Sequence, residues 1–260
     1  MRVAAIIPAR FASTRLPGKP LSLIHDWPMV RHVYERAKRA SSVHEVVIAT
    51  DDQRVMDAVT AFGGRALMTS PTCPTGTDRL AEAAKQIAAD IYVNVQGDEP
   101  MIDPALIDVA VNALQNDSTA AISTLSLPLT SLEEMLSDAV VKVVVDVKKH
   151  ALYFSRSPIP HVRTAERSLE SAARAAIRAG TARKHVGLYV YRRETLAGFA
   201  ALSPSPLEAQ EQLEQLRALH HGLKILVEPV EGEGTVAVDT PADLERVRFL
   251  ISPDVTRSHP

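Results

Sequence analysis

The sequence predicts an α/β protein built around a doubly wound, mostly parallel sheet. Short runs rich in Val and Ile alternate with helical patterns over residues 3–100, which is typical of successive βαβ units. The 260 residues suit one large domain with a sizeable core. We therefore expect a single domain over residues 1–260, made of a first half, 1–119, and a second half, 120–260.

The elements of the first half follow from apolar periodicity and from the residues that stop it. Pro28 suits the first turn of a helix, and Gly63 with Gly64 suits the end of the next one. The expected strands cover residues 3–9, 45–50, 65–69 and 91–100. The expected helices cover residues 28–40, 52–62 and 77–90. Right-handed crossovers gather the loops at the carboxyl ends of such strands, where we expect the chemistry.

The pattern changes after about residue 120, where strand-like runs follow one another with little helix between them. Such runs favour antiparallel or mixed pairing, so we expect a smaller mixed sheet here. The expected strands cover residues 121–129, 140–147, 151–156, 185–193 and 224–230. The polar stretch 161–184 is rich in Ala and Arg and predicts a surface helix that is partly mobile.

The last third of the chain predicts two further helices. Residues 206–219 read as one continuous helix. Residues 236–250 predict a strand, a loop and a helix that begins at Asp239 or Thr240, with Pro241 just inside it. No internal repeat or long linker separates these elements.

Composition narrows the class of protein. With 31 acidic and 29 basic side chains, the chain has no net positive field for coating nucleic acid or a membrane surface. The apolar run after Arg2 is too short for a secretory signal or a membrane span, so we expect a cytoplasmic protein. The single cysteine, Cys73, cannot form an intrachain disulfide, and no His or Cys spacing fits a zinc site.

A local cluster of cations follows the first expected strand. The stretch "IIPARFASTRLPGKPL" carries Arg10, Arg15 and Lys19, and Pro17 and Gly18 break regular structure there. Three cations and unpaired backbone N–H groups in one loop suit a polyphosphate. The alternative is a solvated surface loop. The loop is neither a Walker loop nor a dinucleotide fingerprint, and its RxxxxRxPxK spacing resembles the triphosphate-gripping loop of sugar nucleotidyltransferases.

Two carboxylates are candidates for a Mg²⁺ site. Asn94, Gln96 and Asp98 alternate with apolar or small residues, so they would share one face at the end of a strand. Asp98 there could bind Mg²⁺, which usually takes one or two carboxylates plus substrate phosphate. Asp239 also follows an apolar run and could be the second ligand. The alternatives are that Asp98 caps a turn before Pro100 and that Asp239 only caps a helix.

Several motifs together resemble one family, the 3-deoxy-manno-octulosonate cytidylyltransferases, or CMP-Kdo synthetases. They are "IIPARFASTRLPGKPL", "TGTDRLAEA", "NVQGDEPMI", "VKVV", "ALYFSRSPIP", "HVGLYVYRR", "PLEAQEQLEQLRAL" and "VDTPADLERVR", in this order over about residues 2–248. The resemblance implies a Rossmann-like fold of the nucleotide-diphospho-sugar transferase type and a homodimer that pairs through the mixed-sheet excursion. It also implies a Mg²⁺-dependent reaction of CTP with 3-deoxy-D-manno-octulosonate (Kdo) to CMP-Kdo and diphosphate, for lipopolysaccharide biosynthesis.

The same resemblance implies roles for individual residues. Arg10, Arg15 and Lys19 would neutralise the triphosphate, and Asp98 and Asp239 would hold the metal, with Asp98 and the three cations as the catalytic set. The substrate-binding residues would be Thr75, Gly76, Thr77 and Arg79 for the cytidine, and Gln96, His185, Tyr189, Glu214, Gln215 and, as a weaker candidate, Arg156 for the sugar acid. In the family the turn reads Ser-Gly-Thr, whereas this chain has Thr75 first.

The mechanism and the identity of the sugar leave alternatives open. His185 could act as a general base, but a lone His in a strand is more often a binding or core residue, and we favour binding. A sister enzyme would use another acidic sugar, such as 8-amino-Kdo or a sialic acid. A catalytically silent nucleotide-binding protein could share the fold, but such a protein is expected to lack a loop cation or a carboxylate, and all of them are present.

Overall fold

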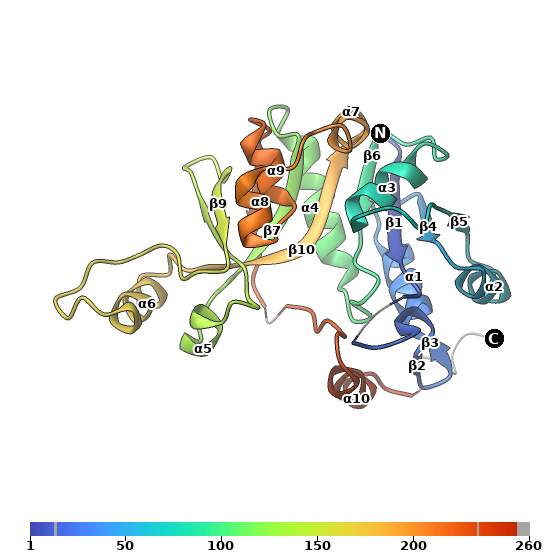
Figure 1. Cartoon of the computed structure of the whole chain (residues 1–260), viewed down its shortest axis with the longest axis horizontal. Helices are drawn as coiled ribbons and strands as arrows, with labels where there is room; N and C mark the ends of the chain where they lie inside the picture. The colour runs from blue at the N-terminus through green and yellow to red at the C-terminus, as the bar shows by residue number, and fades with distance from the viewer. Residues whose placement is uncertain (13–14, 233, 254–260) are drawn as a thin grey trace. The chain divides into compact units, whose positions relative to one another are not determined.

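The computed structural model of the chain describes residues 1–12, 15–232 and 234–253. Its contacts group into two compact units that interleave along the chain. The first unit comprises Met1–Val111, Val190–Ala200 and the chain from Thr235, and the second comprises Asn112–Tyr189 and Ala201–Gly234. The predicted division at residue 119 therefore lies close to the first crossing between units, but two later segments return to the first unit. Figure 1 labels the elements.

The first unit contains a parallel sheet in the order β6-β1-β4-β5. Its strands are β1 (Val3–Ala9), β4 (Glu45–Thr50), β5 (Ala66–Met68) and β6 (Ile91–Asn94). Central β1 is buried along its length except at Pro8, because both faces are covered by helices. The chain runs outward from β1 to β5 and then returns to place β6 on the other side of β1. The sheet therefore has a switch point between β1 and β6, the position where open α/β sheets bind ligands.

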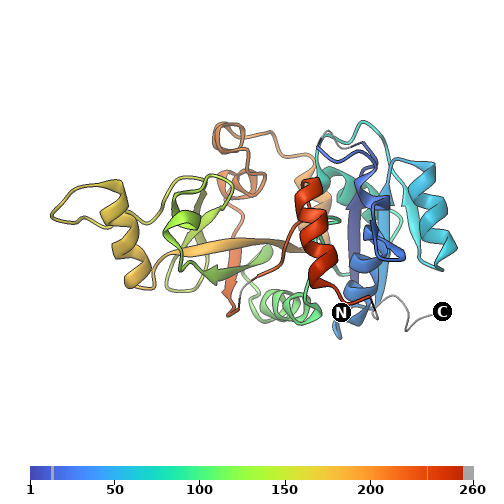
Figure 2. The same cartoon turned by 90° about the horizontal axis from the view of Figure 1, so that it is seen from below.

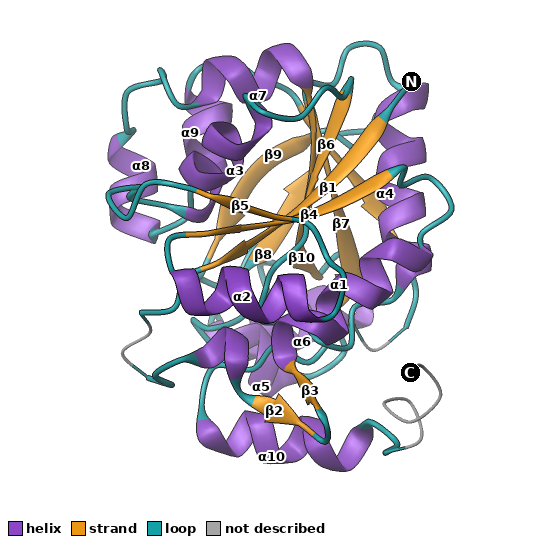
Figure 3. Ribbon diagram, turned by 90° about the vertical axis from the view of Figure 1, so that its right-hand side faces the viewer, coloured by secondary structure: helices purple, strands orange, loops and turns teal. Residues whose placement is uncertain are grey.

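Helices flank this sheet on both faces, as Figure 3 shows, with α1 and α2 on one side and α3 and α7 on the other. Their bounds are α1 (Met29–Arg39), α2 (Gln53–Ala61), α3 (Gly76–Ala84) and α7 (Arg193–Phe199). The arrangement follows from right-handed crossovers, because reversing direction along the sheet moves the connecting helix to the other face. This part of the predicted doubly wound fold is confirmed.

The C-terminal helix α10 (Pro241–Leu250) also belongs to the first unit. Its residues Leu244 and Val247 pack with Ile24 and Met29 in one buried cluster. Ile24 lies in a small antiparallel pair formed by β2 (Leu23–Ile24) and β3 (Trp27–Pro28), which follows the short 3₁₀ helix η1 (Lys19–Leu21). Figure 2 shows α10 in red beside the blue N-terminal elements. The last helix is thus anchored to the loop region that follows β1.

The second unit has a mixed sheet, as predicted. β7 lies between β10 and β11 and is parallel to β11, and β8 pairs antiparallel with both β9 and β10. The strands are β7 (Ile122–Pro128), β8 (Lys142–Val145), β9 (Ala151–Ser155), β10 (Arg183–Arg192), which continues into the first unit, and β11 (Ile225–Pro229). The helices are α5 (Leu132–Leu136), α6 (Leu169–Arg178), α8 (Pro206–Glu211) and α9 (Gln215–His220), and α4 (Pro104–Asn116) passes from the first unit into the second.

The expected helix within 161–184 is confirmed as α6. Ala173 and Ala176 on α6 pack with Met135 of α5 in a small apolar cluster, and Figure 2 shows the two helices in the same part of the second unit. Ser168 caps α6 by accepting a hydrogen bond from the backbone N–H of Ser171. The helix is held in place because Ala172, Ala173 and Ala176 are buried.

Four predicted elements differ from the structure. Residues 206–219 form two helices, α8 and α9, instead of one, because Gln212 adopts a left-handed conformation with φ 53°. The strand expected at 236–239 is absent among the described residues, and that segment is irregular. The helix expected at 77–90 ends at Ala84. The strand expected at 91–100 ends at Asn94, so alternation cannot extend to Asp98. No helix in the described part of the chain is long and apolar enough to cross a membrane.

Candidate active site

The switch point of the first unit brings together two loops that are far apart in the sequence. The loop after β1 carries the predicted cations, and the loop after β6 carries Asp98. Gly97 allows the second loop to pass close to the end of β1, because a Cβ atom at this position would lie 2.5 Å from the carbonyl oxygen of Pro8. Lys19 follows Gly18, whose φ of 68° turns the chain into η1. The backbone of these loops, rather than a regular element, positions the charged groups.

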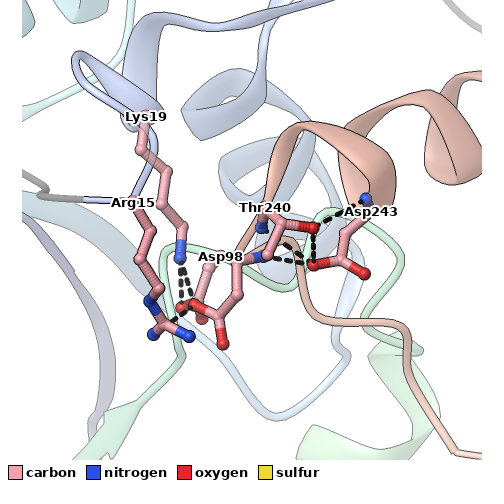
Figure 4. A network of polar contacts seen from close by, with 6 residues as sticks. Arg15, Lys19, Asp98, Thr240 and Asp243 are labelled. Atoms are coloured by element: carbon pink, nitrogen blue, oxygen red, sulfur yellow. Dashed lines mark hydrogen bonds and ion pairs between the residues drawn. The ribbon is translucent and has the colours of Figure 1, made fainter.

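An ion cluster occupies this position, and Figure 4 shows its side chains converging. The Lys19 ammonium donates to Asp98 Oδ2 at 2.7 Å and to Asp239 Oδ1 at 3.0 Å. Arg15 Nη2 donates to the same Asp239 oxygen at 3.1 Å. The Lys19 side chain is 14% exposed, whereas those of Asp98 and Asp239 are 32% and 40% exposed. The cluster therefore combines a shielded cation with two carboxylates that solvent can reach.

The backbone explains why Asp98 and Asp239 lie together. The N–H of Val238 donates to the carbonyl oxygen of Asp98 at 2.8 Å, which joins the two carboxylate-bearing segments. Thr240 caps α10 by accepting from the Asp243 N–H, and Asp243 accepts in return from the N–H groups of Thr240 and Asp239. Because Thr240 serves as the cap, the alternative that Asp239 only caps the helix is wrong. The Asp239 carboxylate is directed to the cations instead.

The pair of carboxylates fits a hard divalent cation. Both reach the same ammonium, so both could reach one ion placed near that position. Within the described residues, no group of three or more His, Cys, Asp or Glu side chains could hold a metal by itself. Mg²⁺ does not need such a group, since it commonly keeps water and substrate phosphate in its remaining positions. The donor set therefore suits Mg²⁺ that arrives with a phosphate ligand.

Sequence reasoning missed Glu99, which follows Asp98 directly in the chain. Its side chain is buried, and Oε2 accepts a hydrogen bond from the Thr235 hydroxyl at 2.9 Å. Burial raises the pKa of Glu99 to about 7, the negative charge of Asp98 adds to the increase, and the Thr235 hydrogen bond opposes it. The bond ties the segment before Asp239 to the Asp98 loop. The position of Glu99 next to Asp98 in "QGDEP" is the sequence feature that could have pointed to it.

The predicted cytidine turn lies next to the first loop. Arg10 Nη2 donates to the carbonyl oxygen of Pro74 at 2.9 Å, so Arg10 contacts the turn instead of the carboxylates. Thr75 caps α3 by accepting from the Asp78 N–H. Gly76 has open space where a Cβ would lie, and Thr77 is buried in the first turn of the helix. The turn thus presents a helix N-terminus and open space next to Arg10.

Arg79 lies in the protein interior, where its side chain is not exposed for direct contact with a substrate. The side chain is fully buried, and Nη2 forms an ion pair with Asp51 Oδ2 at 2.7 Å. Nη1 donates to the hydroxyl of Thr69. The guanidinium therefore supports the predicted cytidine turn from the protein interior.

His185 and Tyr189, both predicted to contact the sugar acid, lie on β10 in the second unit. The His185 ring is 5.1 Å from the ring of Phe154 and 5.2 Å from that of Tyr189, and Nε2 lies 2.9 Å from the hydroxyl of Thr124. Burial lowers the pKa of His185 to about 3. A neutral imidazole with so low a pKa is a weak base, which favours binding over general-base catalysis.

The remaining predicted sugar residues lie in loops or at the ends of regular elements. Gln96 lies in the loop between β6 and Asp98. Glu214 and Gln215 lie at the start of α9. The guanidinium of Arg156 is directed to backbone carbonyl groups of its own unit. The structure thus brings Arg15, Lys19, Asp98 and Asp239 together in the first unit and groups His185 with Tyr189 in the second.

Comparison with known proteins gives one family. The family model described as "Cytidylyltransferase" matches residues 4–225. The 3-deoxy-manno-octulosonate cytidylyltransferase of Geotalea daltonii is 54% identical over 247 residues, covering 95% of this chain and 97% of the relative. The protein with the same name from Myxococcus xanthus is 49% identical over 251 residues, with 96% of each chain covered.

Solved structures agree with these relatives. CMP:2-keto-3-deoxy-manno-octonic acid synthetase complexed with CTP has a TM-score of 0.87 and 45% identity, covering 96% of this chain and 98% of the other. A glucose-1-phosphate thymidylyltransferase from Bacillus anthracis has a TM-score of 0.63 at 16% identity, over 95% of this chain and 94% of the other, and the likeness is one of fold alone.

Proposed function

The chain belongs to the 3-deoxy-manno-octulosonate cytidylyltransferase family, and from that premise we propose that it transfers a cytidylyl group from CTP to Kdo. The products are CMP-Kdo and diphosphate. The observation that carries the proposal is the cluster of Lys19 and Arg15 with Asp98 and Asp239 at the sheet switch point. It combines cations for a polyphosphate with carboxylates for a hard cation in one place.

The cations of the first unit bind the triphosphate. Lys19 and Arg15 form ion pairs with the two carboxylates. CTP offers phosphate oxygens in exchange, and the cations turn to these oxygens because a triphosphate carries more negative charge than two carboxylates. Arg10 lies against the turn at Pro74 and binds the phosphates from the cytidine side. Cations held in this way stabilise the charge that moves onto the leaving diphosphate.

Asp98 and Asp239 hold Mg²⁺ in this proposal. When bound, the ion supplies a Lewis acid that neutralises the phosphate charge and favours ionisation of the attacking hydroxyl. Two hydrogen bonds keep both carboxylates at the switch point. One joins the Val238 N–H to the Asp98 carbonyl oxygen, and the other joins the Thr235 hydroxyl to Glu99. No protein nucleophile is required, because the Kdo hydroxyl itself forms the new bond to the α-phosphorus as the bond to diphosphate breaks.

The turn of Thr75, Gly76 and Thr77 receives the cytidine, with Arg79 supporting it from inside. Gln96, His185, Tyr189, Glu214 and Gln215 bind the sugar acid. His185 acts as a neutral hydrogen-bonding group, consistent with its lowered pKa. The chain works as a homodimer in the cytoplasm, where CTP is made, and its product is the activated sugar for lipopolysaccharide. The names and the high coverage of the relatives support the transfer of a cytidylyl group to Kdo.

The proposal is tested by measuring diphosphate release with CTP and Mg²⁺ while Kdo, 8-amino-Kdo and a sialic acid are offered in parallel. We expect release with Kdo at the highest kcat/KM and no release when Mg²⁺ is removed with a chelator. A preference for either other sugar would refute the assignment of the sugar. Absence of release with all three would refute the enzymatic function itself.

A further inference from the structure

Two of the residues assigned to the sugar, Glu214 and Gln215, lie at the break between α8 and α9. Gln212 ends α8 in the left-handed conformation, and α9 begins three residues later at Gln215. Among the described residues, neither Glu214 nor Gln215 has a hydrogen bond or ion pair through its side chain. Two side chains without protein partners can meet a ligand in one geometry only if their backbone is fixed. Other residues must therefore fix the backbone at the helix break.

Arg217 holds the break from the side of α9. Its Nε donates to Glu208 Oε2 at 2.9 Å, and its Nη2 donates to Oε1 at 2.5 Å, so the pair is bidentate. The two side chains are only 8% and 11% exposed. Glu208 also accepts from the backbone N–H of Ser205, which completes the capping box at the start of α8. One carboxylate thus links the first turn of α8 to the first turn of α9.

Arg156 holds the break from the side of the neighbouring strand β9. Its Nε donates to the carbonyl oxygen of Glu211 at 2.7 Å and its Nη2 to that of Gln212 at 3.3 Å. These are carbonyl groups at the end of α8, where a cation is favourable. Its Nη1 donates to the carbonyl oxygen of Asp138 at 2.9 Å. Every guanidinium nitrogen of Arg156 therefore donates to a backbone carbonyl group. A guanidinium that bound the substrate carboxylate would need N–H groups directed at the substrate instead.

Glu211 completes the connection to β9. Its Oε2 accepts from the backbone N–H of Arg156 at 2.9 Å, and its Oε1 accepts from the hydroxyl of Ser155 at 2.7 Å. Because Arg156 contacts the Glu211 carbonyl while Glu211 contacts the Arg156 N–H, the two residues bind each other reciprocally. These hydrogen bonds lower the pKa of Glu211 against the effect of burial, so it remains charged at neutral pH.

We infer that Arg156 and Arg217 are positioning residues for the sugar pocket: with Glu211 and Glu208 they fix the α8–α9 break so that Glu214 and Gln215 meet the sugar acid. The inference rests on the proposed function, because it uses Glu214 and Gln215 as sugar ligands. It assigns to Arg156 an indirect role in place of a direct bond to the sugar carboxylate. Loss of either arginine should then weaken sugar binding and leave CTP binding unchanged.

The test is steady-state kinetics with CTP, Mg²⁺ and Kdo for Arg156→Ala, Glu211→Gln and Arg217→Lys. We expect each substitution to raise the KM for Kdo by about tenfold while the KM for CTP stays within about twofold. The double variant of Arg156→Ala with Glu211→Gln should be little worse than either single variant, because the two residues act through one connection. Arg217→Lys retains the charge but loses the bidentate geometry, so it avoids a buried unpaired carboxylate.

Arg174→Ala is the matched control, since Arg174 also pairs with a glutamate in the second unit but is 54% exposed on the surface of α6. It should leave both KM values unchanged. An increase in the KM for Kdo with Arg156→Ala but not with Glu211→Gln would overturn the inference and assign Arg156 to the sugar carboxylate. Unchanged values in all variants would also overturn it. If the unsubstituted protein releases no diphosphate with Kdo, the proposed function fails instead.

Discussion

Replacing Lys19 with Met tests the ion cluster most directly. Lys19→Met keeps an unbranched side chain, one atom shorter, but removes the charge that two carboxylates share. The pair with Asp98 is mostly shielded and corresponds to about 1–2 kcal/mol, as for a hydrogen bond between charged groups. The pair with Asp239, whose side chain is 40% exposed, adds only about 0.5 kcal/mol because water screens it. We expect the free energy of unfolding without ligands to fall by about 2 kcal/mol.

The same substitution removes one cation from the triphosphate. Loss of one charge-assisted hydrogen bond should raise the KM for CTP by at least about tenfold, and kcat should also fall, because Lys19 stabilises charge on the leaving diphosphate. The measurements are urea unfolding without ligands and diphosphate release over a range of CTP concentrations. Lys38→Met, at an exposed position on α1, is the control and should change neither quantity. An unchanged KM for CTP would refute the assignment of Lys19 to the triphosphate, and unchanged stability would refute the ion pairs.

Three other substitutions probe the remaining parts of the site. Asp98→Asn should lower kcat by about 100-fold or more while the circular dichroism spectrum is retained, and near-normal turnover would remove Asp98 from the metal site. Gly97→Ala should cost about 1–3 kcal/mol in urea unfolding because its Cβ would lie 2.5 Å from the Pro8 carbonyl oxygen, whereas Gly198→Ala, with open space in α7, should cost nothing. For His185, burial lowers the pKa from 6.5 to about 3, so the unfolded chain binds a proton that the folded protein does not, and stability should decrease as the pH falls through this window. Between about pH 7 and pH 5 the His185 contribution amounts to about 2 kcal/mol, so His185→Gln should reduce the pH dependence of stability by that amount, and an unchanged slope would contradict this origin.

Local patterns predicted the regular elements whose residues repeat with one period and end at a clear stop. The strands β1 and β4 have the predicted bounds, because unbroken apolar runs are buried on both faces of a parallel sheet. The start of α10 also followed from sequence, since Thr240 and Pro241 are typical residues for a cap and a first turn. In each case the signal is contained in a few consecutive residues.

Other elements depend on contacts that periodicity does not contain. The apolar and polar pattern over 206–219 continues through Gln212, yet the chain breaks there: Gln212 is left-handed, and Arg156 donates to the carbonyl oxygens of Glu211 and Gln212. The strand expected before Asp239 is irregular, because Val238 bonds to the carbonyl oxygen of Asp98 instead of joining a strand ladder. A secondary-structure propensity averages over many environments, whereas the conformation of these two segments depends on specific tertiary contacts.

The charged residues of the candidate site could be identified from residue order: cations after the first strand, a carboxylate after "NVQG", and a second one before the last helix. The family could be identified in the same way, because the ordered motifs extend over nearly the whole chain. The contacts of these residues come from the fold: Lys19 bridges Asp98 and Asp239, Arg10 donates to Pro74, and Arg79 is buried. The physical reason is that residue type and local order are encoded along the chain, whereas the partner of a charged side chain depends on which distant loops the sheet order brings together.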